Sequence, residues 1–143
     1  MPRNKAEPRF FEATVFIIGK KTSTGNVYPQ SVADKIILDV TTGAKKYTVE
    51  EVAPVDREKN GVKPYESWPK RAMATCVEAR MEDNRLVMKF RLYATKYGKT
   101  LGLVLDNNPI EKMEFYPVGI GVTDKDGVIT NYSLSYVTFE VKK

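Results

Sequence analysis

The residues of this sequence best suited to chemistry are cations and aromatic rings that alternate along one predicted strand. Arg85, Lys89 and Arg91 all stand at odd-numbered positions of the segment 85–93, and Tyr93 continues this row. Because side chains of a strand alternate between its two faces, these residues share one face. Cations that follow phosphates and rings that stack on bases are how proteins hold single-stranded nucleic acid. With the turn predicted to follow, the candidate nucleic-acid-binding residues are Arg85, Lys89, Arg91, Tyr93, Lys96, Tyr97 and Lys99.

A solvated strand face explains the same pattern without a ligand, because exposed Arg and Lys keep a sheet from pairing with other chains. The formal charge of +5 favours anionic partners, either nucleic acid or an acidic protein surface. The sequence has no block of five like charges and none of the glycine-rich and aromatic signatures of known nucleic-acid-binding modules. The solvated face is the favoured interpretation, and nucleic-acid binding is the alternative.

The absence of histidine excludes several classes of enzyme. Ser-His and Cys-His nucleophile pairs cannot form in this chain, which leaves carboxylate or lysine chemistry. The single cysteine, Cys76, cannot form an internal disulfide or a multi-cysteine zinc site, and in a predicted strand it serves packing rather than nucleophilic attack. We therefore expect no enzyme activity and no catalytic, cofactor-binding or metal-binding residue.

Two short motifs share parts of known ligand-binding loops. Asp124 and Asp126 have the spacing of calcium ligands, but Val128 stands where a further oxygen ligand is needed. The run 98–100, Gly-Lys-Thr, ends like a phosphate-binding loop, but Tyr93 occupies the place of its first glycine. Both motifs are therefore interpreted as turns.

Apolar and β-branched residues predict about six strands. Within 85–93, Leu86, Met88, Phe90 and Leu92 alternate and form the face toward the core. In the last strand, apolar side chains change face between positions 136 and 137, which predicts either a bulge or a strand buried on both faces. The predicted strands are 10–18, 46–52, 72–80, 85–93 and the two arms of a hairpin, 113–122 and 128–141.

A helix is predicted over 29–43, because Val32, Ile36 and Val40 recur at every fourth position. A shorter helix is predicted over 101–105. The segment 54–71 is predicted to be a charged loop of eighteen residues, and loops of this length are usually functional or disordered. Its aromatic residues either anchor the loop on the core, which is the favoured interpretation, or contact a partner. These residues are Tyr65 and Trp68.

The predicted fold is α+β, predominantly antiparallel β in a barrel-like or sandwich arrangement, with one or two short helices. Residues 1–9 are predicted to be a flexible basic arm before a single domain over 10–143. Arg3 and Lys5 in this arm, with Tyr65 and Trp68, are candidate partner contacts. No apolar run approaches the ~20 residues of a membrane span, and the first nine residues lack the apolar core of a signal peptide.

Four short motifs occur in an informative order. They are Asn-Val-Tyr-Pro at 26–29, Thr-Lys-Tyr-Gly-Lys at 95–99, Phe-Tyr-Pro-Val-Gly-Ile-Gly at 115–121 and Asp-Gly-Val-Ile at 126–129. This order resembles the layout of the phage prohead proteases, relatives of the herpesvirus assemblin. The resemblance covers residues 10–141. It implies a protease-like fold.

The sequence departs from that family where the family carries its chemistry. Tyr116, Pro117 and Val118 occupy the place of the catalytic serine, and no serine lies between Ser67 and Ser133. The family's histidine also has no counterpart. No catalytic residue can be carried over, so the resemblance implies a fold that has lost the chemistry and kept a role in viral assembly.

The resulting prediction is a non-enzymatic structural protein of a tailed phage. It would act in the virion or the host cytoplasm, as a decoration or head-assembly protein that binds capsid or other virion proteins. The first alternative is a phage single-stranded nucleic-acid-binding protein that uses the basic strand face. The second is a phage-encoded inhibitor that docks on a host protein. Salt dependence separates the lead from the first alternative, because phosphate contacts weaken steeply with salt.

Overall fold

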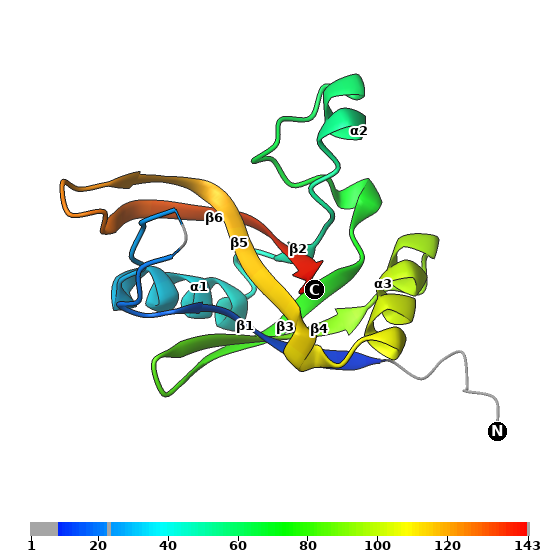
Figure 1. Ribbon diagram of the computed structural model, residues 1–143, viewed down its shortest axis with the longest axis horizontal. Coiled ribbons are helices and arrows are strands. Elements are labelled where there is room, and N and C mark those ends of the chain that lie inside the picture. Colours follow the sequence, from blue (N-terminus) through cyan, green and yellow to red (C-terminus); the bar gives the residue numbers. More distant parts are fainter. Residues whose placement is uncertain (1–8, 23, 143) are drawn as a thin grey trace.

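The computed structural model describes residues 9–22 and 24–142, within which six strands form one curled sheet (Figure 1). The strand order is β1-β4-β3-β2-β6-β5, and all neighbours are antiparallel except β2 and β6. The sheet forms a half-open barrel, which confirms the predicted α+β, mainly antiparallel class. The strands are β1 Phe10–Ile17, β2 Thr48–Val49, β3 Ala74–Glu82, β4 Arg85–Leu92, β5 Met113–Thr123 and β6 Ile129–Val141.

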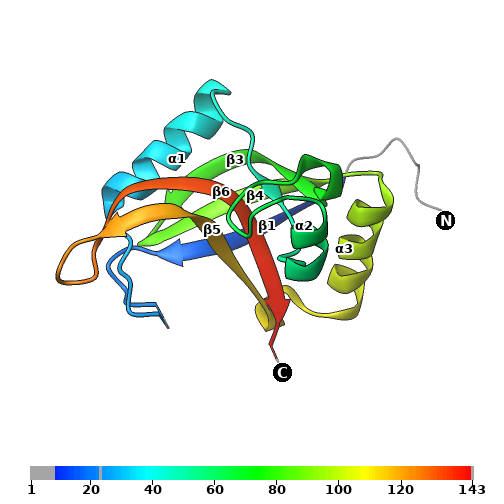
Figure 2. The ribbon, with the colours of Figure 1, turned by 90° about the horizontal axis from the view of Figure 1, so that it is seen from above.

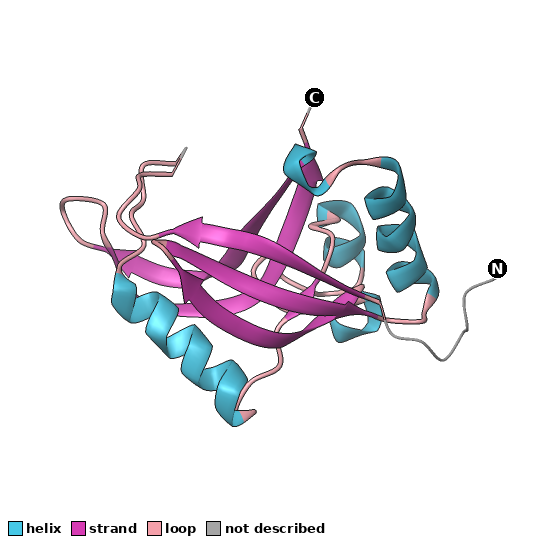
Figure 3. Ribbon diagram, turned by 90° about the horizontal axis from the view of Figure 1, so that it is seen from below, coloured by secondary structure: helices cyan, strands magenta, loops and turns pink. Residues whose placement is uncertain are grey.

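Three α-helices accompany the sheet in the described residues, where one or two were predicted. Helix α1 (Gln30–Thr42) packs on β3 and β6, whereas α2 (Pro54–Lys59) and α3 (Lys96–Asn107) lie toward the other end of the sheet (Figures 2 and 3). Two short 3-10 turns, Pro69–Arg71 and Ile110–Lys112, complete the elements. Of the helices in the described part of the chain, none combines the length and apolar character needed to cross a membrane.

Strand β4 shows the predicted alternation. Leu86, Met88 and Phe90 are fully buried in the core, where the Phe90 ring stacks on Phe11 with ring centroids 5.3 Å apart. The strand is central, paired with β1 on one side and β3 on the other. Leu86, Met88 and Phe90 are therefore covered on one face of the curled sheet, and the charged residues lie on the opposite face together with Val87, which is 5% exposed.

The predicted change of face in β6 arises from a bulge. Val118 pairs with Tyr136 but the next residue, Gly119, pairs with Leu134, so Ser135 is an extra residue in β6. Leu134 and Val137 consequently both join the core, while Tyr136 is buried on the other face against Arg57. Both predicted explanations, a bulge and burial on both faces, hold for this strand.

Three predictions of element bounds are wrong. The predicted loop 54–71 contains helix α2, the strand predicted over 46–52 is only Thr48–Val49, and α3 begins at Lys96 rather than at residue 101. Thr95 caps α3, because its Oγ1 accepts a hydrogen bond from the Gly98 N–H at 3.2 Å. A Cβ at position 98 would collide with the Tyr93 carbonyl, so glycine in this first turn serves a close backbone approach and does not mark a break.

Candidate binding groove

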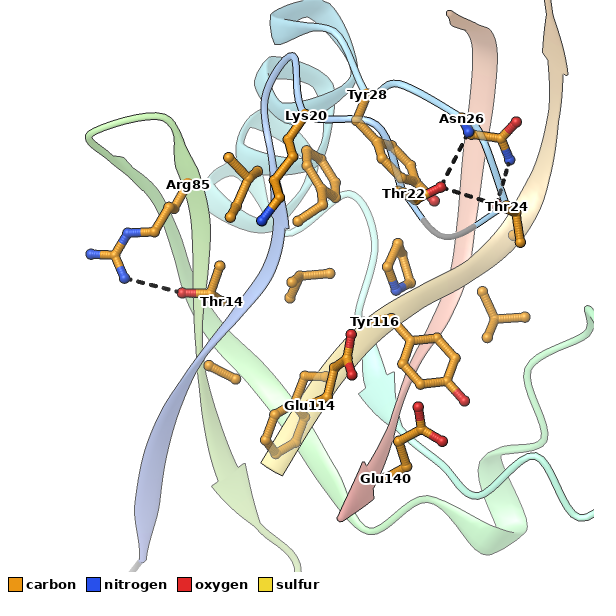
Figure 4. Close-up of a pocket in the computed structure, with 18 of the residues that line it drawn as sticks. Thr14, Lys20, Thr22, Thr24, Asn26, Tyr28, Arg85, Glu114, Tyr116 and Glu140 are labelled. Atoms are coloured by element: carbon orange, nitrogen blue, oxygen red, sulfur yellow. Dashed lines mark hydrogen bonds between the residues drawn. The ribbon is translucent and has the colours of Figure 1, made fainter. Parts of the chain in front are cut away.

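The two edge strands of the sheet, β1 and β5, enclose a half-open groove of about 1250 Å³ (Figure 4). No ladder joins these strands in the described residues, although they approach at one end, where the Phe11 and Phe115 rings lie 5.6 Å apart. The other end is lined by Lys20, Lys21, Thr22, Thr24, Asn26 and Tyr28. The groove is the seam at which the curled sheet fails to close into a barrel.

Strand β1 presents a free backbone edge at this seam. The Leu92 N–H donates to the Arg9 carbonyl at 2.9 Å, which makes these residues a hydrogen-bonded pair of the β1–β4 ladder. In an antiparallel ladder such pairs alternate with pairs whose backbone groups point away. The N–H and C=O groups of Phe10, Glu12 and Thr14 are therefore directed away from β4.

Strand β5 is a poorer template for pairing. The Lys142 N–H donates to the Lys112 carbonyl at 2.7 Å, so the same alternation directs the backbone groups of Met113, Phe115 and Pro117 away from β6. Pro117 has no N–H to offer, and proline in sheets is typical of such an edge. The two register shifts further along the β5–β6 ladder come from extra residues in β6, so the interruption on β5 itself is Pro117.

The two ends of the groove carry opposite charges. Lys20 and Arg85 lie at one end, and Glu114 and Glu140 at the other (Figure 4). Glu114 and Glu140 are directly opposite each other in the β5–β6 ladder, and neither forms an ion pair with another described residue. Like charges at such positions destabilise a sheet. Burial, with the carboxylates of Glu140 and Glu114, raises the pKa of the Tyr116 phenol beside them.

The basic strand face is largely neutralised by its neighbours in the sheet. Arg80 of β3 forms ion pairs with three carboxylates on this face, at 2.7, 3.2 and 3.0 Å, and Arg85 shares one of them at 3.1 Å. Lys89 lies with its ammonium 4.9 Å from the centre of the Phe10 ring. Four cations therefore face three carboxylates. They are Arg80, Arg85, Lys89 and Arg91 against Glu12, Glu78 and Glu82.

The remaining candidate nucleic-acid contacts lie elsewhere. Lys96, Tyr97 and Lys99 belong to the first turns of α3 rather than to a turn continuing the β4 row. Tyr93 follows the end of β4 and is half-buried, and the Tyr97 ring packs against the Arg71 guanidinium at 4.9 Å. Nucleic-acid binding through these residues stays a prediction, and the carboxylates around Arg80 lower the charge available for it.

Trp68 anchors the segment between β2 and β3. Its backbone N–H donates to Glu50 Oε1 at 2.7 Å, and the guanidinium groups of Arg57 and Arg71 lie 5.8 and 5.3 Å from its ring. Tyr65 is 38% exposed, with the Lys63 ammonium 5.8 Å from its ring. The anchoring role fits Trp68, while Tyr65 remains available to a partner. Arg3 and Lys5 lie outside the described residues.

A buried ion pair beneath this segment was not predicted. Glu50 and Arg57 are 0% and 1% exposed, and Arg57 Nη2 donates to Glu50 Oε1 at 2.9 Å. The hydroxyls of Thr48 and Ser67 donate to Glu50 Oε2 at 2.6 and 2.7 Å, and the Arg57 guanidinium lies 4.5 Å from the Tyr136 ring. The hydrogen-bonding partners of Glu50 and Arg57 lie within β2 and the segment that follows it, so the pair holds the 50–68 segment on the sheet.

Cys76 has the packing role expected of it. The thiol is partly buried in β3 and donates to the Glu78 carbonyl at 3.2 Å. Burial raises the pKa of this thiol to about 12. Because the thiolate is the reactive form of cysteine, Cys76 is a poor nucleophile at neutral pH.

A comparison with known proteins shows which type of fold this is. No model of a known protein family matches the sequence, and no curated protein matches it. Among solved structures, the chain is similar to the capsid assembly protease gp21 of bacteriophage T4, with a TM-score of 0.68 and 15% sequence identity. The match covers 90% of this chain and 80% of the protease chain. The chain therefore has the phage prohead protease-like fold that the order of its motifs predicted.

Proposed function

We propose that this chain is a non-enzymatic, capsid-associated protein of a tailed phage that binds other virion proteins as a decoration or head-assembly protein. The observation that supports this proposal best is the combination of fold and composition. The fold is similar to that of a capsid assembly protease, yet the sequence contains no histidine and no serine between Ser67 and Ser133. A retained fold without its nucleophile and base favours a binding role in the same setting.

The local structure of β5 supports the loss of chemistry. Tyr116, Pro117 and Val118 line the groove with a phenol, a ring without N–H and an aliphatic side chain, none of which is activated for nucleophilic attack. At Gly119 an added Cβ would collide with the Ser133 carbonyl and with the Tyr132 ring. A serine at that position therefore does not fit without a shift of the backbone.

The groove supports a binding role. It combines a free strand edge on β1, an apolar floor that includes Ala13, Val15 and Phe115, and carboxylates without an ion-pair partner in the described residues. Free strand edges are used repeatedly for the recognition of extended segments of other proteins. These features are those of a protein-binding surface.

The absence of protease activity is tested directly by incubation with capsid and scaffold proteins of the phage that encodes the chain. We expect every substrate to keep its intact mass, because the chain has neither a serine in β5 nor any histidine. Intact-mass spectrometry over a day provides the measurement, with the phage's own active maturation protease as the positive control. Specific cleavage that disappears with a point change in this chain would overturn the proposal.

A further inference from the structure

We infer that the groove between β1 and β5 binds an extended peptide segment of a virion protein, which pairs with the free edge of β1. The segment would place a basic side chain between Glu114 and Glu140 and an acidic side chain beside Lys20 and Lys21. The source of the segment rests on the proposed function. Its chemistry follows from the groove itself.

The backbone at the seam selects β1 as the pairing strand. Phe10, Glu12 and Thr14 present N–H and C=O groups away from β4 at alternate positions, as an added strand requires, up to the bulge at Val15. On β5, Pro117 lacks a donor, so a peptide that paired with that strand would lose a main-chain hydrogen bond there. A peptide entering the groove therefore gains its main-chain hydrogen bonds from β1 and contacts β5 through side chains.

The acidic end of the groove is suited to bind a cationic side chain. Glu114 and Glu140 are cross-strand neighbours, both exposed, and form no ion pair with the described residues around them. Like charges directly opposite each other destabilise a sheet unless a counter-charge relieves them. An arginine side chain is suited to this place, because its planar guanidinium can donate to two carboxylates at once.

The opposite end of the groove is suited to bind an anionic side chain. Lys20 and Lys21 are exposed, and neither forms an ion pair with another described residue. Arg85 is engaged with Glu82 at 3.1 Å, so the two lysines supply most of the free positive charge there. Strand β1 has eight residues with a bulge at Val15, so a peptide of eight or nine residues can span the groove and pair regularly along residues 10–14.

The floor between the two ends calls for apolar side chains. Ala13, Val15 and Phe115 are 5%, 4% and 6% exposed and line the groove from both edge strands. Because strand side chains alternate, every second residue of a bound peptide would face this floor. The expected ligand is therefore a segment with a basic end, alternating small apolar and polar residues, and an acidic end.

The probe is a fluorescein-labelled nine-residue peptide with arginine at one end, alternating valine and serine in the middle and two aspartates at the other end. The same peptide in reverse order serves for the opposite strand direction. Fluorescence anisotropy with the full chain should show saturable binding for one direction. If neither peptide binds at protein concentrations up to about 1 mM, where even weak complexes would form, the inference is overturned.

Charge reversal tests the acidic end. Changing Glu114→Lys and Glu140→Lys together should weaken binding about ten-fold, and a peptide with glutamate in place of its arginine should regain the affinity. Glu58→Lys, a change at another exposed glutamate on α2 outside the groove, should leave the affinity unchanged. Equal losses in both variants, or no rescue by the altered peptide, would contradict the assignment. Circular dichroism checks that each variant is folded.

Strand pairing has its own control. Two further peptides are methylated on backbone nitrogens, one at the odd positions and one at the even positions. The peptide whose methyl groups replace the N–H donors toward β1 should not bind, and the other should bind as before. Equal effects of the two methylation patterns would exclude pairing with β1. Self-association by a second copy, measured by sedimentation, would also overturn the inference if Glu114→Lys abolished it and no peptide bound.

The outcomes also separate this inference from the proposed function. If the chain associates with capsids while no peptide binds in the groove, the inference fails and the proposed function stands. If a peptide binds in the groove but the chain never associates with virion proteins, the proposed function fails and the groove specificity stands.

Discussion

Replacing Arg57 by alanine is expected to lower the free energy of unfolding by about 3–5 kcal/mol, because it leaves a charge buried without its partner. The Glu50 side chain is fully buried, and Arg57 is the cation that contacts it, at 2.9 Å. The substitution also removes the donors that satisfy the carbonyls of Val52 and Glu51. Urea unfolding followed by circular dichroism measures the loss.

A matched control is available in the same region. Arg71 pairs with Asp56 at 2.7 Å, but the Asp56 side chain is 57% exposed, so Arg71→Ala leaves no buried charge. With the loss of its contacts with the Trp68 and Tyr97 rings, the change should cost about 1–2 kcal/mol. The double variant Glu50→Ala with Arg57→Ala should lose less than the sum of the two single changes, because no lone charge remains. Equal small losses for Arg57→Ala and Arg71→Ala would show that the buried pair contributes little.

Trp68, the only tryptophan, gives this experiment a second readout. Its backbone N–H donates to Glu50 and its ring lies beside Arg57, so its fluorescence follows the attachment of the 50–68 segment. If Arg57→Ala releases that segment alone, the fluorescence transition will precede the loss of secondary structure. Coincident transitions would mean that the pair stabilises the whole sheet.

Phe90→Ala is expected to cost about 3–5 kcal/mol, because it removes a fully buried ring from the middle of the central strand β4. The cavity would also remove the stack with Phe11, whose ring packs on Phe115 of the other edge strand. The loss should therefore loosen the contact between β1 and β5. Urea unfolding gives the magnitude.

Lys89→Ala provides the comparison on the adjacent residue. This side chain lies on the opposite face over the Phe10 ring, and its loss should stay within about 1 kcal/mol. A similar loss at positions 89 and 90 would contradict the assignment of the two faces of β4. A small loss at both would place Phe90 outside the core.

The alternating strand and the main helix could be predicted from the sequence because their signals are local. Leu86, Met88 and Phe90 alternate cleanly, and α1 lies within one residue of its predicted range because its apolar residues repeat at helical spacing. The start of α3 was missed because Gly98 resembles a turn residue. Its role, a close approach to the Tyr93 carbonyl, depends on a contact that no local pattern reveals.

The candidate groove could not be predicted for a different reason. It exists because β2 pairs in parallel with β6, which brings the hairpin at the end of the chain round toward β1. The pairing between elements far apart in sequence has no signature in the residues themselves. The buried partnership of Glu50 and Arg57 is equally hidden, since charged residues in a proline-containing segment are typical of a solvated loop.

The proposed role of the chain is that of a binding protein of the phage capsid. It is tested most directly by quantitative mass spectrometry of proheads and mature particles, purified from cells infected with the phage that encodes it. The account predicts a fixed copy number of the chain relative to the major capsid protein in at least one of these particles, with an unprocessed mass. Its absence from both, with all of the chain in the free protein fraction, would contradict the account.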